Sequence, residues 1–252
     1  FADSSDLGKD VSGNGLDFAA NNMGTANFTN DRPADSGSTI GNYCTWNPLD
    51  FDANAGTLTN ANRTRTQAAG GGGQFATIAA TSGRYYVEIE LTSYTGSNTI
   101  GVRPITSASN STDGIGIDPS TGDTYLDGAL QNNGAALSNG DVIGFDIDLD
   151  NDQVSIYVND TIRGSAITMS VGKKASEGVP QGIATNDAGN SQVVVLRADS
   201  GLWSYSAKGS GKPFCTANLP APSITKPSDQ FLPIVYEGNG GGQRVGNFIP
   251  FT

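Results

Sequence analysis

Residues 140–160 read GDVIGFDIDLDNDQVSIYVND, a stretch in which acidic and apolar side chains alternate. Phe145, Ile147 and Leu149 fall on one side of an extended chain and the intervening aspartates on the other, which is the pattern of a strand with one buried face. A second alternating run, from Val154 to Val158, follows the turn-forming residues 150–153, because Asn and Asp tolerate turn dihedrals. The stretch therefore predicts a β-hairpin whose acidic face is solvated.

The aspartates of this stretch also raise the question of a metal site. An EF-hand loop counted from Asp146 needs Gly at its sixth position and Glu at its twelfth, where the chain has Asn151 and Tyr157. The EF-hand pattern therefore fails. A looser calcium site at the hairpin tip is the alternative to a solvated acidic face, because hard oxygen ligands gather there; its ligands would be Asp148, Asp150 and Asp152. We expect no other metal and no cofactor.

The composition of the 252 residues favours an almost all-β protein. The chain has 34 Gly and 36% hydrophobic residues, which is typical of many short strands joined by tight turns. It carries 14 basic and 25 acidic residues, a formal net charge of −11, and no basic run that could follow a phosphate backbone. No apolar stretch approaches the roughly 20 residues that span a bilayer. We expect neither a nucleic-acid partner nor membrane insertion.

Further strand-like runs occur at short intervals, which indicates a sandwich of antiparallel sheets. They are Phe75–Ala79, Arg84–Thr92, Thr99–Ile105, Gly114–Asp118, Thr124–Leu126, Ala166–Met169, Gly182–Thr185 and Val193–Leu196, with a single strand over Thr57–Thr66. We assign the sandwich to residues 43–212. Residues 1–42 predict an irregular N-terminal arm, and residues 213–252 a Pro- and Gly-rich extended C-terminal arm or linker. Because the first residue is Phe1, we expect a longer parent chain.

Three of these runs resemble the SPRY (B30.2-like) domain. They are SGRYYVEIEL at 82–91, IGV at 100–102 and the hairpin at 140–160. The resemblance implies a concanavalin-like, SPRY-type antiparallel β-sandwich with irregular N- and C-terminal arms. It also implies a family known mainly for recognition of proteins and peptides, which is an analogy at the level of the fold.

The flanking stretches are similar to another group of proteins. DSSDLG, NYCTWNPLD and FCTANLPAPSI look like the surroundings of SPRY-like modules in bacteriophage tail-fibre-like proteins. This resemblance implies a viral protein on the surface or tail of the phage particle, and a homotrimer. The partners it implies are a host-surface glycan or protein and other virion proteins or copies of the chain itself.

Cys44 and Cys215 lie far apart in sequence but in similar settings. If the two ends of the domain pair as neighbouring strands, the two thiols come close in space. A disulfide between Cys44 and Cys215 and two buried reduced thiols are both open, whereas a zinc site needs more ligands than two cysteines.

Catalysis has few candidate residues. The chain has no His, which excludes a Ser-His-Asp or Cys-His arrangement. Glycoside hydrolysis needs only two carboxylates, and Glu88 and Glu90 project from one strand face about 6.6 Å apart. An exposed acidic strand face is the simpler explanation of this pair, so we expect no enzyme.

Aromatic side chains are better candidates for binding, since each combines apolar area with a polar group. Those considered are Tyr86, Tyr94, Tyr125, Tyr157 and Trp203. We select Tyr125, Tyr94 and Arg103 as ligand-binding residues, because Tyr125 lies beside a turn and Arg103 at the end of a strand. We expect the N-terminal arm to cover Tyr157, and Trp46 and Trp203 to lie in the core or at a seam.

The sequence therefore predicts a non-catalytic virion surface or tail-fibre module for receptor binding, with carbohydrate binding as one form of it. The predicted contact loops are Arg103–Asp113, Gln131–Asn139 and Thr185–Ser191. The competing hypothesis is a purely architectural virion structural protein, which would act as a spacer, a decoration or an oligomerisation module. A polysaccharide depolymerase, which would use Glu88, is the third.

Overall fold

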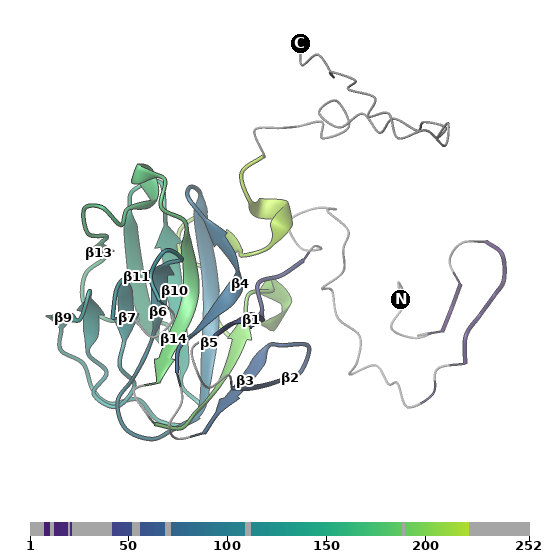
Figure 1. Cartoon of the computed structure of the whole chain (residues 1–252), viewed down its shortest axis with the longest axis horizontal. Coiled ribbons are helices and arrows are strands. Elements are labelled where there is room, and N and C mark those ends of the chain that lie inside the picture. Colours follow the sequence, from purple (N-terminus) through teal and green to yellow (C-terminus); the bar gives the residue numbers. More distant parts are fainter. Residues whose placement is uncertain are drawn as a thin grey trace, which may run out of the picture. The chain divides into compact units, whose positions relative to one another are not determined.

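The computed structural model describes residues 8–10, 13–19, 21, 42–51, 56–68, 72–108, 112–187 and 190–221. The chain separates into two compact units, Phe1–Pro220 and Ala221–Thr252, and of the second unit only Ala221 is described. Regular structure in the described residues is β-strand and short 3-10 helix (Figure 1). Most of the predicted N-terminal and C-terminal arms lie outside the described residues.

The first sheet has seven strands, and each pair of neighbours in it is antiparallel. In spatial order they are β1 (Trp46–Phe51), β4 (Gln74–Ala80), β14 (Gln181–Asp187), β6 (Asn98–Pro104), β7 (Ile115–Ile117), β8 (Thr124–Leu126) and β9 (Ala129–Asn132).

The second sheet has nine strands. Seven of them follow one another as β12 (Thr161–Ile162), β11 (Gln153–Val158), β10 (Val142–Asp148), β5 (Arg84–Tyr94), β15 (Gln192–Arg197), β3 (Thr64–Gln67) and β2 (Thr57–Thr59). The other two are β13 (Ile167–Thr168), which pairs with β11, and β16 (Lys212–Pro213), which pairs with β5 in parallel. The described residues also contain three 3-10 helices: η2 (Ala175–Glu177), η3 (Ser200–Leu202) and η4 (Thr216–Asn218).

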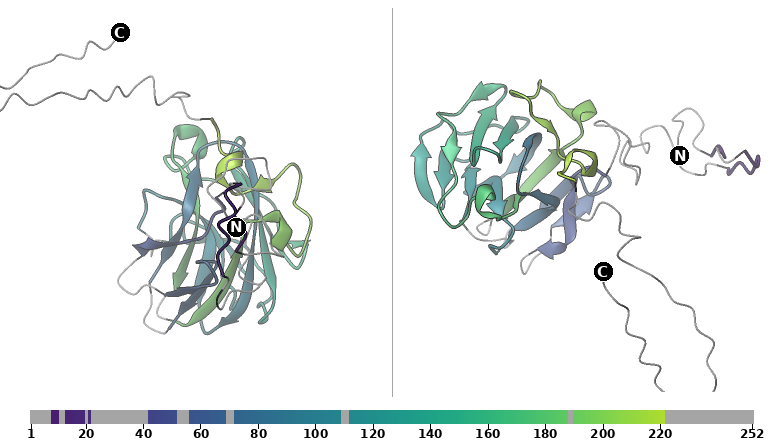
Figure 2. Two further views of the ribbon diagram at one scale, coloured as in Figure 1. Left: turned by 90° about the vertical axis from the view of Figure 1, so that its right-hand side faces the viewer. Right: turned by 90° about the horizontal axis from the view of Figure 1, so that it is seen from above.

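The predicted hairpin is confirmed as β10 and β11, which pair antiparallel from Ile143↔Val158 to Asp148↔Gln153. The apolar side chains from Ile143 to Val158 are at most 4% exposed and belong to one core with those of the other sheet, as the alternation requires. The two sheets stack face to face around this core (Figures 1 and 2). The all-β antiparallel sandwich expected from the sequence is therefore correct.

The acidic face of the hairpin is solvated only in part: Asp150 is exposed, but the expectation was wrong for Asp146. Asp146 is only 3% exposed, and Arg84 of β5 binds its carboxylate. A segment that we call the strap, residues 198–219, runs over this outer face of the nine-stranded sheet. Trp203 of the strap packs edge-on against Tyr86 with ring centroids 5.0 Å apart. Periodicity gives the side of a strand on which a residue lies, but not what covers that side.

The strap also accounts for Tyr157. The ammonium of Lys208 lies 5.2 Å from the centre of the Tyr157 ring and forms an ion pair with Asp160. Tyr157 is therefore covered by the C-terminal strap, whereas we expected the N-terminal arm. Trp46 is fully buried in the core, as predicted.

The two ends of the sandwich meet. The amide of Thr216 donates to the carbonyl of Asn42 at 3.0 Å, and the amide of Cys44 donates to the carbonyl of Phe214 at 2.9 Å. Tyr43 and Cys215 form the bridge between these two bonds, so their side chains share one face of the pair. The side chain of Cys44 points to the opposite face. Both cysteines are consequently free, buried thiols, and the disulfide that the sequence left open is not formed.

The weak strand expected over Thr57–Thr66 is a hairpin of β2 and β3. Asn60, Ala61 and Asn62 have positive φ and form the turn between the two strands. Strands β1 and β9 were not predicted; the first contains Pro48, and the second lies at the start of a predicted loop. In the described part of the chain, no helix has the length and apolar character needed to cross a membrane.

Candidate functional site

A hollow of about 220 Å³ opens on the outer face of the seven-stranded sheet, over β6, β7 and β8. Ile115 and Ile117 of β7 point into the core, so Gly116 between them faces outward. Gly116 and Tyr125 are direct neighbours in the register of β7 and β8, and both line the hollow. Because Gly116 has no side chain, the floor beside Tyr125 is backbone.

Glycine is required at this floor. A Cβ on Gly116 would lie 2.7 Å from Cγ2 of Thr99 and 2.9 Å from the carbonyl oxygen of Ile100. Gly114 at the edge of the hollow has φ +92°, and a Cβ there would lie 2.4 Å from the carbonyl oxygen of Val102. All three distances are too short for a real side chain, so a residue other than glycine does not fit at either position without displacing its neighbours.

Two of the three predicted binding residues line this hollow. Arg103 of β6 alternates with the core residue Val102 and so lies on the outer face, yet it is only 2% exposed. Tyr125 is half-buried. The structure therefore brings a guanidinium and a phenol ring, which the sequence places 22 residues apart, into one site.

Asp118 is a rigid acceptor at the same site. It is 5% exposed, and its Oδ1 accepts hydrogen bonds from the amide of Ser120 at 2.8 Å and from its hydroxyl at 2.7 Å. The hydroxyl of Ser97 donates to Oδ2. A carboxylate offers about four acceptor positions, so these three bonds fix its orientation and leave acceptor capacity.

The rim of the hollow is held by Lys173. Its ammonium lies 2.6 Å from Oδ1 of Asp113 and 3.1 Å from Oδ1 of Asp127, and so joins two loops that flank the hollow. The hydrogen bond that Lys173 donates to Asp113 raises the pKa of Lys173. Burial raises the pKa of Asp127, but hydrogen bonds from Ser170, from the amide of Gly114 and from Lys173 outweigh it and leave the pKa below its ordinary value. Lys173 and Asp127 are therefore charged near neutral pH.

Tyr94 does not lie at this site. It belongs to β5 of the other sheet, packs against the core, and its hydroxyl donates to the carbonyl of Leu137 at 2.7 Å. It positions the loop before β10.

The predicted contact loops are only partly loops. Arg103–Asp113 contributes Thr112 and Asp113 to the hollow. Gln131–Asn139 begins inside β9, and Leu137 within it is buried. Thr185–Ser191 begins inside β14, where Thr185 is fully buried.

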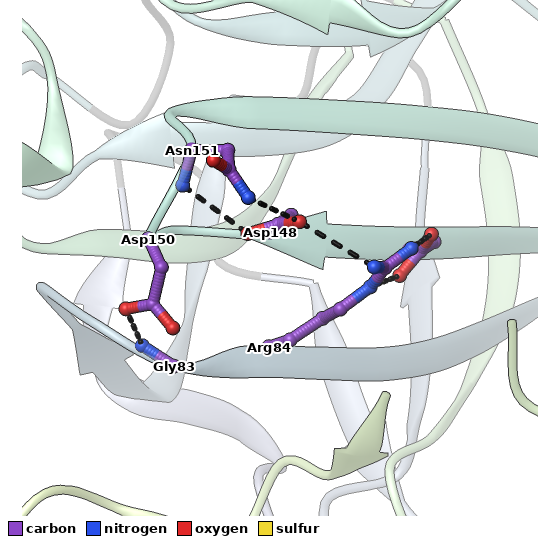
Figure 3. A network of polar contacts seen from close by, with 6 residues as sticks. Gly83, Arg84, Asp148, Asp150 and Asn151 are labelled. Atoms are coloured by element: carbon purple, nitrogen blue, oxygen red, sulfur yellow. Dashed lines mark hydrogen bonds and ion pairs between the residues drawn. The ribbon is translucent and has the colours of Figure 1, made fainter. Parts of the chain in front are cut away.

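The three calcium candidates point to different partners. Asp148 accepts from Asn151 and lies 3.5 Å from the Arg84 guanidinium, whereas Asp150 accepts from the amide of Gly83 at 2.7 Å (Figure 3). Asp152 accepts from the amide and hydroxyl of Ser176. In the described residues no three His, Cys, Asp or Glu side chains are grouped as metal ligands. Each of the three carboxylates accepts hydrogen bonds from protein donors.

Glu88 and Glu90 have structural partners, and the expected exposed acidic face was wrong for Glu88. Glu88 is fully buried; its carboxylate accepts from the amides of Ser204 at 2.6 Å and Tyr205 at 2.9 Å and from the hydroxyl of Tyr86 at 3.2 Å. Glu90 forms an ion pair with Arg197. Both residues lie beneath or beside the strap, on the sheet opposite the hollow, so neither is placed to act on a ligand there.

Asp118 and Lys173 were missed by sequence reasoning. Asp118 stands at the end of a strand run and opens a stretch, PSTG, that predicts a turn. The Asp-x-Ser spacing was a signal for its hydrogen bonds with Ser120, but not for its position beside Tyr125. Lys173 lies 60 residues from Asp113, and no local pattern connects the two.

Comparison with known proteins gives structural likeness only. No family model and no curated protein matches the chain. Similar solved structures include the SPRY domain of human HERC1, with 14% identity and a TM-score of 0.47 over 63% of this chain and 99% of that one. The TRIM65 PSpry domain has 14% identity and a TM-score of 0.48 over 61% of this chain and 91% of that one. Stonustoxin has 16% identity and a TM-score of 0.47 over 61% of this chain and 28% of that one.

Two of these three are SPRY domains by name. The two-sheet architecture rests on the strand pairing itself, and likeness at this level of identity assigns no ligand to the hollow.

Proposed function

We propose that the sandwich is a non-catalytic binding module whose ligand enters the hollow between Arg103 and Tyr125. The observation that carries the proposal is the convergence of a buried guanidinium, a fixed carboxylate and a half-buried phenol ring around one glycine floor. A concave site with a few fixed polar groups is the usual form of a binding site in proteins.

A binding role is favoured over catalysis by the residues themselves. The chain has no His, and Glu88 and Glu90 are engaged with the strap and with Arg197. The hydrogen bonds to Asp118 and the ion pair to Asp113 hold these side chains as fixed acceptors. Fixed acceptors suit recognition of a ligand.

We further propose that the module acts on the surface or tail of a phage particle and adheres to a glycan or protein of the host surface. The support is the resemblance of the flanking stretches to those of tail-fibre-like proteins. In this proposal binding requires no cofactor, and other virion proteins or further copies of the chain hold the module in place.

The experiment is binding of the fluorescently labelled full chain to intact host cells. Tyr125→Ala removes the ring, and Thr112→Trp fills the hollow from an exposed position. Tyr205→Ala is the matched control, because Tyr205 is also half-buried but lies on the strap. Saturable binding that both hollow variants lose and the control keeps supports the proposal.

Three other outcomes count against it. Equal binding by the parent chain and all three variants would show that the ligand binds outside the hollow. No binding, together with release of new reducing sugar ends from host polysaccharide, indicates a depolymerase, and no binding or release at all indicates a purely architectural role.

A further inference from the structure

The size of the hollow limits what it holds. Pockets for drug-sized ligands have volumes of roughly 300–1,000 Å³. The hollow measures about 220 Å³ and lies close to the backbone at Gly114 and Gly116. It therefore takes one small unit of a larger ligand, such as a single sugar ring or a single amino-acid side chain.

The charges at the hollow disfavour an anion. Arg103 lines it together with Asp113 and Asp118, and Lys173 and Asp127 stand directly behind the rim. These five groups comprise two cations and three carboxylates. A ligand carboxylate or phosphate would meet a net negative site, while a ligand cation would meet Arg103. A neutral ligand group avoids repulsion by the carboxylates and repulsion by Arg103.

The lining also disfavours an apolar anchor. Protein ligands are usually anchored by aromatic or aliphatic side chains that fill desolvated apolar pockets. Here the lining offers hydroxyls from Ser97, Thr99 and Thr112 and the aromatic ring of Tyr125, whereas the side chain of Ile115 points into the core. One flat ring surrounded by fixed donors and acceptors fits a group that has an apolar face and several hydroxyls.

We infer that the hollow recognises one neutral, polyhydroxylated sugar ring, and that Asp118 is its specificity-determining acceptor. The ring lies against Tyr125, Asp118 accepts from a ring hydroxyl, and Arg103 donates to a ring or hydroxyl oxygen. This inference rests on the proposed function, because it names the class of ligand for the same hollow.

Asp118 is suited to this role because it cannot turn away. Ser97 and Ser120 hold it through three hydrogen bonds, and it is 5% exposed. A hydrogen bond to a charged acceptor contributes about 1.5–3 kcal/mol. Replacing the carboxylate by an amide should therefore weaken sugar binding about tenfold or more.

The test is titration of the ¹⁵N-labelled full chain, followed by NMR, with methyl glycosides of glucose, galactose, mannose and N-acetylglucosamine. Glucuronic acid and N-acetylneuraminic acid are the anionic probes, and glucosamine is the cationic probe. We expect saturable shifts of the amides of Gly114, Gly116 and Gly128 with at least one neutral glycoside and none with the charged probes.

Asp118→Asn tests the acceptor, with its Tm measured alongside. Ser97→Ala, which loosens Asp118 without removing its charge, is the second variant should Asp118→Asn lose its fold. We expect a Kd about tenfold higher for Asp118→Asn, a smaller increase for Ser97→Ala, and no change for Tyr205→Ala. An unchanged Kd in a folded Asp118→Asn or Ser97→Ala chain overturns the role of Asp118.

Failure of the inference is distinguishable from failure of the proposed function. If Tyr125→Ala abolishes cell binding but no neutral glycoside shifts the hollow amides, the binding module stands and the sugar inference falls. The same holds if an anionic sugar or a protease-sensitive host protein occupies the hollow instead. If neither cells nor glycosides bind, both are overturned.

Discussion

Arg84 of β5 holds Asp146 of β10 through two parallel hydrogen bonds, Nε to Oδ1 at 2.9 Å and Nη2 to Oδ2 at 2.6 Å. The residue directly opposite Arg84 in the sheet is Asp148, so the guanidinium reaches diagonally across the strands to the more buried carboxylate. Gly209 of the strap lies over the guanidinium, where a Cβ would come 2.6 Å from Cζ of Arg84. Arg84 thus neutralises part of the acidic face of the hairpin, and the strap lies over its guanidinium.

Arg84→Met should therefore lower the free energy of unfolding by about 2 kcal/mol. Removing one partner leaves the Asp146 carboxylate buried without its cation, which costs about 3–5 kcal/mol for a fully buried pair; the half-exposed Arg84 side chain reduces this. Urea unfolding followed by fluorescence measures the change. Lys212→Met, at an exposed lysine, should stay within about 0.5 kcal/mol of the parent. Equal effects of the two substitutions would contradict the importance of the pair.

Glu88→Gln should loosen the strap and leave ligand binding intact. The amide NH₂ of Gln cannot accept from the Ser204 and Tyr205 amides as both carboxylate oxygens do, and each buried bond lost costs about 1–3 kcal/mol. Limited proteolysis should cut between residues 203 and 211 faster in this variant. Glu90→Gln is the matched control, because Glu90 is partly exposed. Loss of ligand binding in folded Glu88→Gln would instead connect Glu88 with the site.

Lys173→Met should weaken ligand binding several-fold while reducing stability by only about 1 kcal/mol, since the ion pairs are partly exposed. Without the ammonium, Asp113 and Asp127 repel each other and the rim opens. Calorimetric titration with the ligand gives the Kd, and hydrogen exchange of the Gly114 amide, which donates to Asp127, reports the rim. Unchanged exchange at Gly114 would show that Lys173 does not hold the rim.

Stability should be lost in acid, in part through Asp127 and Asp152. Burial raises the pKa of Asp152, but hydrogen bonds from the hydroxyl and amide of Ser176 outweigh it and leave the pKa below the ordinary 3.8. A lowered folded pKa stabilises the protein fully above the unfolded value and loses this effect as pH falls through the folded value. We expect a flat Tm from pH 8 to about pH 5 and a fall below about pH 4. Asp152→Asn should show a shallower fall, and an identical acid profile would exclude this contribution.

Both thiols should be unreactive in the folded chain. Burial raises the pKa of the Cys44 thiol to about 12 and also raises that of Cys215, so neither forms the thiolate that attacks Ellman's reagent near pH 8. We expect no reaction in buffer and two reactive thiols per chain in denaturant without reductant. No reactive thiol in denaturant would indicate a disulfide between Cys44 and Cys215.

The sandwich could be predicted because its signal is local. The alternation of Phe145, Ile147 and Leu149 places three side chains in the core without reference to any other segment. The state of Asp146 could not be predicted in this way, because its covering strap begins some 50 residues later and has no periodicity. Local patterns determine the direction of a side chain, while its environment depends on segments distant in sequence.

The same limit applies to the hollow. Arg103 and Tyr125 could each be selected as outward-facing residues at strand ends, but their convergence depends on the register of β6, β7 and β8. Tyr94 met the same chemical criterion and yet donates to the Leu137 carbonyl in the interior. A tyrosine in a strand is equally suited to a binding surface and to a hydrogen bond within the fold.

The hydrogen bond between Thr216 and Asn42 holds the two ends of the sandwich together. When the two ends of a folded domain are in contact, the residues on either side of it stay close together. Such a domain can be removed from a chain, or inserted into a surface loop of another protein, with little change to the host structure. In the seven-stranded sheet, β7 and the hollow lie four strands away from β1, the strand nearest to these two joined ends.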